Sequence, residues 1–482
     1  MGSINKTSVR EEVDRLKKEF GQLNLKRKIP KECLVLIKSM FVIIELIVAI
    51  FLERSTKKNS KNSNIPSSQT DKDESALEHL GSNSKGNNEN NATANNIRIK
   101  ESVNLSKVIQ CDTCGEDSSK TPNQQCERRT KIDIVFEKVV EHIDVQIKRC
   151  PSCKSTTKGK FPSDMPAPLQ YGNGLKAYII NLLVCQMIAL NRVQKLVKAM
   201  IATSISEASL LKFVLHLYLA LANWQSCAQE KLLMKRTINV DETSLRVDKN
   251  NHWIHVYSSG EITLKFLHRK RGCQAINDIN IIPRFSGAII HDCWSAYLSY
   301  NHCEHALCGS HLIRELRFVV ESNGYVWAGK IKRLLQETCK KVSKSKRKKL
   351  TKKAYANLQI RYRNILTQGK KELPVIPAKP NGKRGKMAKS DAHNLWERLH
   401  KHESAVLLFA KESSVSFTNN RAERDLRMSK VKQKISGCFR TELYAKAYCR
   451  ISSYLQTMAT KGYNPLIAIQ MALSGKIDLG GE

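Results

Sequence analysis

Acidic residues are scarce in this sequence relative to basic ones. Its 482 residues include 44 Asp and Glu against 81 Lys and Arg, which leaves a formal net charge of +37. Repulsion among so many like charges opposes compaction, so the composition argues against an ordinary globular enzyme. The excess indicates a polyanionic partner, and nucleic acid is the commonest polyanion that proteins bind.

The sequence also lacks the pattern of a disulfide framework and of a secretory signal. Its 15 cysteines are odd in number, and several, such as Cys185 and Cys449, lie singly inside apolar helical runs. The first thirty residues are charged throughout, unlike a secretory signal. We therefore expect a reducing, cytoplasmic environment in which some thiols are free and others bind metal. The apolar fraction of 41% excludes wholesale disorder but predicts polar linkers.

Two apolar helices are predicted within residues 1–54. The second covers Leu34 to Leu52 and just reaches the length of a membrane span, but Lys38 and Glu45 would each cost about 2.5–3.5 kcal/mol near a bilayer centre. We favour a packing or oligomerisation helix over a transmembrane one. The first helix carries a coiled-coil seam with 4-3-4-3 spacing, formed by Val9, Val13, Leu16, Phe20 and Leu23.

A polar linker and a cysteine-rich segment follow. Residues 55–105 are rich in Ser, Asn and Lys, a composition that buries too little apolar surface to become ordered. In residues 106–160, two Cys-x-x-Cys pairs flank a strand-like stretch and predict a structural zinc site. Four reduced thiols in turns are the alternative, and Cys126 is a substitute ligand. The four predicted ligands are Cys111, Cys114, Cys150 and Cys153.

Residues 161–235 are predicted to be helical and to bind DNA. One helix covers "ALNRVQKLVKAMI", and the next, "ATSISEASLLKFVLHLYLAL", begins with a capping box formed by Ser204 and Glu207. A helix, a short turn and a capped helix are typical of a helix-turn-helix. An ordinary antiparallel helix pair fits the same pattern equally well.

The hydrophobic period changes at Arg236. Residues 236–311 read as three strands, helix, strand, helix, strand and helix, which is the order of a ribonuclease-H-like fold. A basic helical insertion covers 312–405, and residues 406–482 return to compact helical character. The predicted fold class is therefore α/β, of the α+β multidomain kind, with a ribonuclease-H-like mixed sheet as its core.

Three carboxylates stand where this topology would bring them together. Asp241 lies in the first strand and Asp292 ends the fourth, which is its neighbour in this fold, while Glu423 lies on a late helix. Two hard cations about 3.5–4 Å apart stabilise both oxygens of a phosphodiester displacement, and Mg²⁺ takes oxygen ligands. The three residues are therefore predicted to be catalytic and to bind two Mg²⁺ or Mn²⁺ ions. Glu242 is not included among the catalytic residues, because its side chain alternates to the other side of the strand. The alternative for any one of these carboxylates taken alone is a structural role, which is common for a single Asp at a strand end.

Basic residues follow Glu423 in helical register. Arg427, Lys430 and Lys434 fall on the same helix face and are predicted to contact the DNA backbone. The alternative is a row of solvated ion pairs. Asn419 precedes the helix and, like Asn420, could cap it.

A second cluster contains thiols and imidazoles at spacings that suit a transition metal. For its last two members we favour packing or substrate orientation over metal binding. The cluster comprises His302, Cys303, His305, Cys308 and His311.

Several motifs resemble the insertion sequence 66 family of bacterial transposases. They are "NVDET", "GAIIHDCWSAY", "HALCGSHLIREL" and "FTNNRAERDLRMSKVKQKISGCFRT". The linker, the cysteine pairs and "YGNGLKAYIINLL" resemble the N-terminal half of the same family. The resemblance is collinear from about Lys57 to the C-terminus.

This resemblance implies a DDE-type recombinase in which Asp241, Asp292 and Glu423 are the catalytic carboxylates. It implies cleavage of the ends of a DNA element and transfer of the freed 3′-hydroxyl to target DNA, without a covalent protein–DNA intermediate. The N-terminal half would bind terminal inverted repeats. We expect a homo-oligomer on DNA that is associated with the bacterial nucleoid and not with a membrane. Accessory proteins of the same element are further expected partners. Thr418 stands where many relatives have Asp, a position outside the three carboxylates.

Two other functions are compatible with the sequence. One is a zinc-ribbon and helix-turn-helix DNA-binding protein with a vestigial nuclease domain, and the intact set of three carboxylates argues against it. The other is a membrane-attached protein built on Leu34 to Leu52. The repeat sequence, the target preference and the oligomeric state are not encoded in any recognisable pattern.

Overall fold

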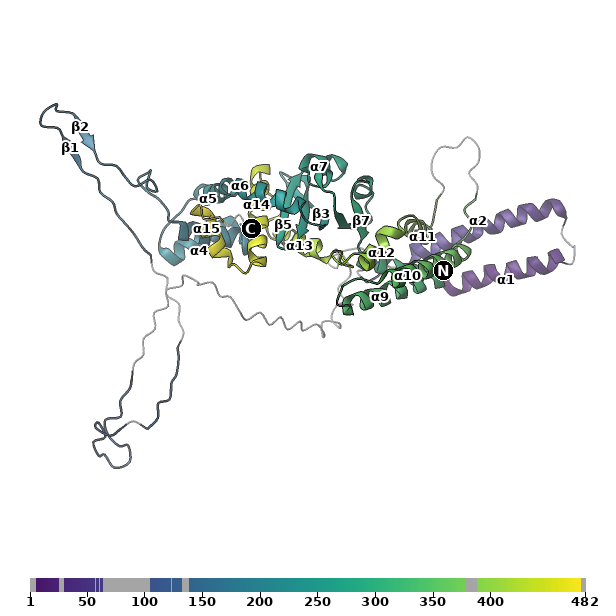
Figure 1. The fold of residues 1–482 in the computed structure, drawn as a ribbon, viewed down its shortest axis with the longest axis horizontal. Helices are drawn as coiled ribbons and strands as arrows, with labels where there is room; N and C mark the ends of the chain where they lie inside the picture. Colours follow the sequence, from purple (N-terminus) through teal and green to yellow (C-terminus); the bar gives the residue numbers. More distant parts are fainter. Residues whose placement is uncertain are drawn as a thin grey trace, which may run out of the picture. The chain divides into compact units, whose positions relative to one another are not determined.

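The computed structural model describes residues 6–25, 30–56, 58–59, 61–63, 105–122, 124–131, 138–377 and 388–477 (Figure 1). The chain divides into two compact units, Met1–Lys85 with Leu221–Thr460 and Leu479–Glu482, and Gly86–Ala220 with Lys461–Asp478. Most of the predicted linker, residues 55–105, lies outside the described residues. The sequence predicts seven segments along the chain, a finer division than these two units, and their boundaries stay predictions.

The first unit is built around a five-stranded mixed sheet with the order β5-β4-β3-β6-β7. The first three strands in sequence form the predicted antiparallel meander, and β6 and β7 run parallel to β3. This arrangement confirms the predicted mixed α/β fold class. The strands are β3 (Thr237–Val247), β4 (Asn250–Ser259), β5 (Ile262–His268), β6 (Ala288–His291) and β7 (Glu304–Leu307).

The turns and the close strand approach follow from local sequence. Asp248 and Lys249 join β3 to β4 with positive φ angles of 46° and 62°, which suits the two-residue turn of a twisted hairpin. Gly287 precedes β6, where an added Cβ would lie 2.5 Å from the carbonyl oxygen of Arg236. Only glycine therefore lets β6 pair with the start of β3.

Helices cover the sheet from several parts of the chain. The helix α13 contacts β3 and β4, α14 and α6 contact β5, and α12 contacts β7. Trp224 on α6 meets Tyr454 on α14 edge to face, with ring centroids 5.1 Å apart. These helices are α6 (Ala222–Leu233), α12 (Glu403–Lys411), α13 (Asn420–Ser436) and α14 (Glu442–Thr460), while α7 (Cys273–Ile279) follows β5 in the chain.

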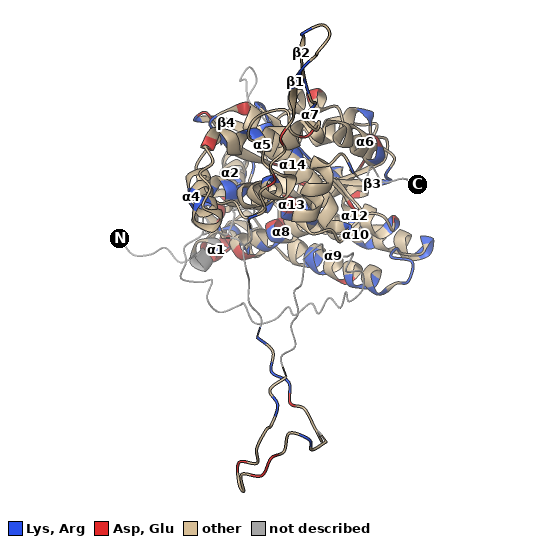
Figure 2. Ribbon diagram, turned by 90° about the vertical axis from the view of Figure 1, so that its left-hand side faces the viewer, with Lys and Arg blue, Asp and Glu red and all other residues tan. Residues whose placement is uncertain are grey.

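The predicted basic insertion forms a helical layer whose apolar core is continuous with β6 and β7. Trp327 and Tyr362 are fully buried in that core, and Lys and Arg recur along α8 and α9 (Figure 2). The basic run at 340–353 spans the end of α9, a turn and the start of α10. The helices are α8 (Gly309–Asn323), α9 (Val326–Lys344), α10 (Lys352–Glu372) and α11 (Asp391–Lys401).

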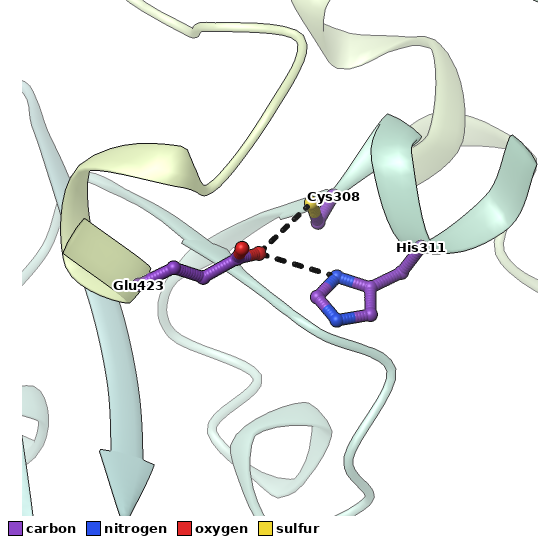
Figure 3. A group of neighbouring side chains, drawn as sticks. All are labelled: Cys308, His311 and Glu423. Carbon is purple, nitrogen blue, oxygen red and sulfur yellow. Dashed lines mark hydrogen bonds and ion pairs between the residues drawn. The ribbon is translucent and has the colours of Figure 1, made fainter. Parts of the chain in front are cut away.

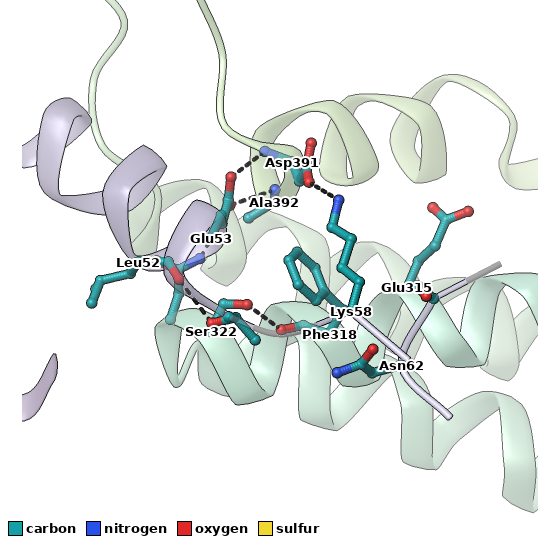
Figure 4. A network of polar contacts seen from close by, with 12 residues as sticks. Leu52, Glu53, Lys58, Asn62, Glu315, Phe318, Ser322, Asp391 and Ala392 are labelled. Carbon is teal, nitrogen blue, oxygen red and sulfur yellow. Dashed lines mark hydrogen bonds and ion pairs between the residues drawn. The ribbon is translucent and has the colours of Figure 1, made fainter. Parts of the chain in front are cut away.

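The predicted N-terminal helices are α1 (Lys6–Leu25) and α2 (Lys31–Ser55), which pack against each other. Within the described residues, Cys33–Ser55 is the one helix long and apolar enough to cross a membrane. Its C-terminal end is buried in the unit, where Glu53 accepts hydrogen bonds from the backbone N–H groups of Asp391 and Ala392 (Figure 4). Glu53 thereby caps α11 across the fold.

The second unit contains four α-helices among its described residues and a short strand pair. The apolar side of α5 is buried, and α5 contacts α3, α4 and α15. The helices are α3 (Asn173–Ile180), which continues into the π-helical turn η3 (Asn181–Cys185), α4 (Leu190–Ile201), α5 (Glu207–Ala220) and α15 (Pro465–Leu473). The strands are β1 (Ile147–Arg149) and β2 (Thr156–Lys158).

Two local predictions in this unit are wrong. The sequence predicts a capping box formed by Ser204 and Glu207, but α5 begins at Glu207 and the hydroxyl of Ser206 accepts the N–H of Ser209 at 3.1 Å. The strand-like stretch before Cys150 is strand only at 147–149 among its described residues, while residues 132–137 lie outside them. Its alternating pattern finds no long partner strand in the described part of the unit.

Candidate active site

Asp241 and Asp292 extend from neighbouring parallel strands at the same level. The last paired residues of β3 and β6 are Asn239 and Ile290. Asp241 lies two residues after Asn239, and Asp292 lies two residues after Ile290. Because side chains alternate along a strand, equal even offsets place both carboxylates on the same face at the carboxyl end of the pair.

Glu423 reaches this edge from the first turn of α13, which packs on β3. Asn419 fixes the start of the helix. Its amide Nδ2 donates to the carbonyl oxygen of Val240 at 2.8 Å, and its Oδ1 accepts from Nδ2 of Asn239 at 2.8 Å. Asn419 is thus the N-cap residue of α13, as one of the two predicted alternatives, but its side chain binds β3 and makes no cap hydrogen bond. The other alternative, Asn420, is the first residue of the helix.

The charges of these carboxylates act on one another. Burial raises the pKa of Asp241 well above its usual value, and the negative charges of Glu242, Asp292 and Glu423 raise it further. Burial also raises the pKa of Asp292, whose Oδ1 accepts the N–H of Trp294 at 3.0 Å. The ligand oxygens of Asp241, Asp292 and Glu423 are not gathered within 4.8 Å of one another in the described residues, so their shared cation site stays a prediction. A cation between them would relieve both the desolvation and the repulsion. The carboxylate oxygens are ligands that suit Mg²⁺.

Glu242 is buried on the other side of β3, as the alternation along the strand predicts. Its side chain is 1% exposed and accepts hydrogen bonds from Arg271 at 2.7 and 2.8 Å and from the hydroxyl of Tyr297 at 2.5 Å. The guanidinium of Arg271 lies over the rings of Trp253 and Trp294, 4.9 and 4.3 Å from their centroids. This network links β3 to the segment that follows Asp292. The sequence did not predict this network. The need for a cationic partner of Glu242 becomes visible only once its carboxylate is known to be buried.

The predicted basic face on α13 divides into two kinds of residue. Arg427 and Lys434 are exposed. Lys430 is half-buried, and its Nζ donates to the carbonyl oxygen and the hydroxyl of Ser244, both at 3.0 Å. Two of the three predicted residues are therefore open to a ligand, and the third braces β3.

A basic pocket of about 460 Å³ opens beside the N-terminal end of α13, the end that carries Glu423. Lys235, Arg236, Arg421 and Arg424 contribute to its lining. Asp241, Asp292 and Glu423 do not line it. The pocket thus provides positive charge near the carboxylates without being their own cavity.

The cluster of imidazoles and thiols separates into different environments. His302 and Cys303 contact the backbone carbonyl oxygens of Ile282 and Phe285, and His305 binds His291 with a nitrogen-to-nitrogen distance of 3.0 Å. The other two members, Cys308 and His311, lie beside Glu423 (Figure 3). Among the described residues, these last three form the one group whose ligand atoms all lie within 4.8 Å of one another.

The two Cys-x-x-Cys pairs of the second unit adopt the same turn. The N–H of Cys111 donates to the carbonyl oxygen of Glu116 at 2.9 Å, and the N–H of Cys150 donates to that of Ser155 at 2.8 Å. This repeated geometry presents both thiols of a pair on one side of a tight turn.

The thiols in both turns are suited to metal ligation. The backbone N–H of Cys114 lowers the pKa of Cys111 to about 7, and hydrogen bonds from Ser155 lower the pKa of Cys153 to about 7. Lowered values favour the thiolate that binds zinc. The sulfurs of the two pairs are not gathered into one group in the described residues, so the four-cysteine zinc site stays a prediction.

Comparison with known proteins agrees with the resemblance drawn from the motifs. No curated protein matches the chain in a sequence search. A family model described as Transposase IS66 family matches residues 168–447. The match covers more than half of the chain and includes the whole sheet, the basic insertion and α13. The chain belongs to the IS66 family of transposases.

Proposed function

We propose that this protein is a DNA transposase in which Asp241, Asp292 and Glu423 bind the cations that promote DNA cleavage and strand transfer. The equal offset of the two aspartates on parallel strands carries the proposal. Family membership supports transposition as the reaction and DNA as the partner. The packing of α13 on β3 supports the inclusion of Glu423.

The chemistry follows from the carboxylates and their neighbours. Two Mg²⁺ or Mn²⁺ ions, when bound, would supply stabilisation for the attacking and leaving oxygens of a phosphodiester. Asp241 and Asp292 would hold their ligand oxygens at the sheet edge, and Asn419 would keep the start of α13 against β3. Cleavage frees a 3′-hydroxyl at the element end. That hydroxyl then attacks target DNA, exchanging one phosphodiester for another.

The exposed cations around α13 would position the DNA backbone. Arg427 and Lys434 are exposed on the helix, and Arg424 is exposed at the basic pocket. Contacts of this kind fix the register of a duplex without reading its sequence. They would neutralise phosphates beside the carboxylates, whose own charge repels DNA.

The second unit would recognise the terminal inverted repeats. Its supporting features are the pair of cysteine turns, with structural Zn²⁺ as the expected ligand, and the α4–α5 helix pair. Joining two element ends requires at least two copies of the chain, so we expect a homo-oligomer on DNA, with accessory proteins of the same element as further partners. The expected location is the bacterial cytoplasm, at the nucleoid.

The experiment is a nicking assay on duplex DNA that carries an element end. Wild-type protein should nick the end in the presence of Mg²⁺ and not in the presence of a chelator. Asp241→Asn, Asp292→Asn and Glu423→Gln should each abolish nicking while DNA binding survives. Glu261→Gln, which changes an exposed carboxylate in the β4–β5 turn, is the matched control and should nick normally. Binding by the wild type without metal-dependent nicking would instead support a DNA-binding protein with a vestigial nuclease domain.

A further inference from the structure

Cys308 and His311 lie at the start of α8, directly opposite the first turn of α13. Cys308 is the N-cap of α8 and His311 is in its first turn. The two helix ends are brought together at Gly309, whose N–H donates to the carbonyl oxygen of Phe417 at 2.8 Å. A Cβ at Gly309 would lie 2.2 Å from the ring of Phe417. The approach therefore depends on glycine, and it places Glu423 beside the thiol and the imidazole (Figure 3).

The spacing of the three side chains fits one small metal ion. Oε1 of Glu423 lies 3.9 Å from Sγ of Cys308 and 3.6 Å from Nδ1 of His311. Ligands at zinc bond lengths of about 2.0–2.3 Å in a tetrahedron are separated by roughly 3.3–3.6 Å. The observed separations are thus only a few tenths of an ångström wider than a bound ion requires.

One ring nitrogen of His311 faces Glu423 and makes no hydrogen bond within the described residues. Nδ1 of His311 is buried and has no hydrogen-bond partner in the described part of the chain. A buried nitrogen without a partner costs free energy that a metal bond would recover.

The thiol is placed where its ionised form would be supported. The backbone N–H of Asn419 donates to Sγ of Cys308 at 3.2 Å, and the N-terminus of α8 adds a positive dipole. A metal ion bound at the sulfur would displace the thiol proton.

We propose that Cys308, His311 and Glu423 form a binding site for one transition-metal ion of the Zn²⁺ class. A thiolate and an imidazole select such an ion over Mg²⁺, which prefers oxygen. The ion would hold Oε1 of Glu423 and leave Oε2 for the carboxylate cluster. Only this sharing of Glu423 rests on the proposed function. Ion binding by Cys308 and His311 stands without it.

The test is the metal content of the purified full-length chain, measured by mass spectrometry after dialysis against dilute Zn²⁺. Cys308→Ser and His311→Gln should each contain one zinc fewer per chain than the wild type. Cys303→Ser removes a buried thiol that contacts Phe285 and lies outside the group, so it should lose none. Equal zinc in the wild type and both variants would overturn the proposal.

Cobalt gives a second readout that also detects misfolded variants. Co²⁺-loaded wild type should show more thiolate-to-cobalt charge-transfer absorption than Cys308→Ser. Cys308→Asp supplies an oxygen ligand at the same position and should restore the ion but not that absorption. An unchanged absorption in Cys308→Asp would overturn the proposal, whatever the zinc count.

The nicking assay separates this inference from the proposed function. Zinc lost in Cys308→Ser from a wild type that cannot nick DNA would support the metal site and contradict the transposase mechanism. Metal-dependent nicking by a wild type whose zinc content matches that of Cys308→Ser would support the transposase mechanism and contradict the metal site.

Discussion

Asn419 donates a 2.8 Å hydrogen bond from its side-chain amide to the backbone carbonyl oxygen of Val240, the residue before Asp241. This bond ties the start of the helix that carries Glu423 to the strand that carries Asp241. Asn419 is 1% exposed, so water cannot replace the bond. The relative position of the two carboxylates therefore depends on a residue that ligates nothing.

Replacing Asn419 by Ala should loosen that connection. The carbonyl of Val240 and the amide of Asn239 would both lose a partner, which should lower the free energy of unfolding by about 1–3 kcal/mol. Nicking should slow while DNA affinity stays unchanged. Asn420→Ala alters an exposed neighbour and serves as the control. Normal nicking and an unchanged thermal midpoint in Asn419→Ala would contradict the role.

Arg271 is expected to be a stability residue of the active-site wall. Its removal leaves the carboxylate of Glu242 buried with one hydrogen-bond donor, Tyr297. Removing one partner of a buried ion pair lowers the free energy of unfolding by about 3–5 kcal/mol. We expect a loss at the lower end of this range, because the Arg271 side chain is 41% exposed. Denaturant unfolding of Arg271→Ala should show that loss, and Arg271→Lys should recover only part of it. A lysine lacks the planar group that stacks on the two tryptophans.

The raised pKa of Asp241 predicts a stability that depends on pH and on cations. A raised pKa means that the folded protein binds this proton more tightly than the unfolded chain does. The resulting stability is present below the ordinary value of 3.8 and is lost as the pH rises through the raised value. At neutral pH without divalent cations, Asp241→Asn should therefore melt at a higher temperature than the wild type.

Two controls accompany this measurement. The difference between Asp241→Asn and the wild type should vanish at acidic pH, where Asp241 is protonated. Mg²⁺ should raise the melting temperature of the wild type more than that of Asp241→Asn, since bound ions stabilise the folded state. Glu261→Gln should behave like the wild type. A variant that is less stable than the wild type at neutral pH would contradict the electrostatic account.

The fold was predictable where local pattern and topology agree. The period-two segments at 236–268 predicted the meander, and the run before Asp292 predicted a buried strand. Parallel pairing of β3 and β6 then follows from the order of elements, and it brings Asp241 beside Asp292. These positions rest on strand periodicity, which sequence carries directly.

The remaining features depend on contacts between distant segments. The meeting of Cys308 with Glu423 requires the close approach of Gly309 to Phe417, which no local pattern encodes. The binding of Asn419 to β3 also replaces the local cap that its sequence position favours. From sequence alone, such side chains are predicted to form hydrogen bonds with the backbone nearest to them in the chain. Here tertiary contacts replace those local hydrogen bonds.

DNA binding should separate the residues of the basic face. Arg427→Ala and Lys434→Ala should each weaken binding to any duplex and reduce the slope of log affinity against log salt by about one. Lys430→Ala should instead lower the thermal midpoint, because Lys430 braces Ser244. Lys18→Ala changes an exposed residue of α1 and is the control. Equal salt slopes for the wild type, Arg427→Ala and Lys434→Ala would exclude these contacts.

The most direct test of the shared cation site replaces Mg²⁺ with Fe²⁺ and generates hydroxyl radicals that cut the polypeptide near bound iron. Cuts should cluster in three segments distant in sequence, around Asp241, Asp292 and Glu423. Excess Mg²⁺ should suppress them, and Asp241→Asn should remove them at all three segments together. Cuts confined to a single segment, or cuts that persist in Asp241→Asn, would contradict the claim that the three carboxylates hold common ions.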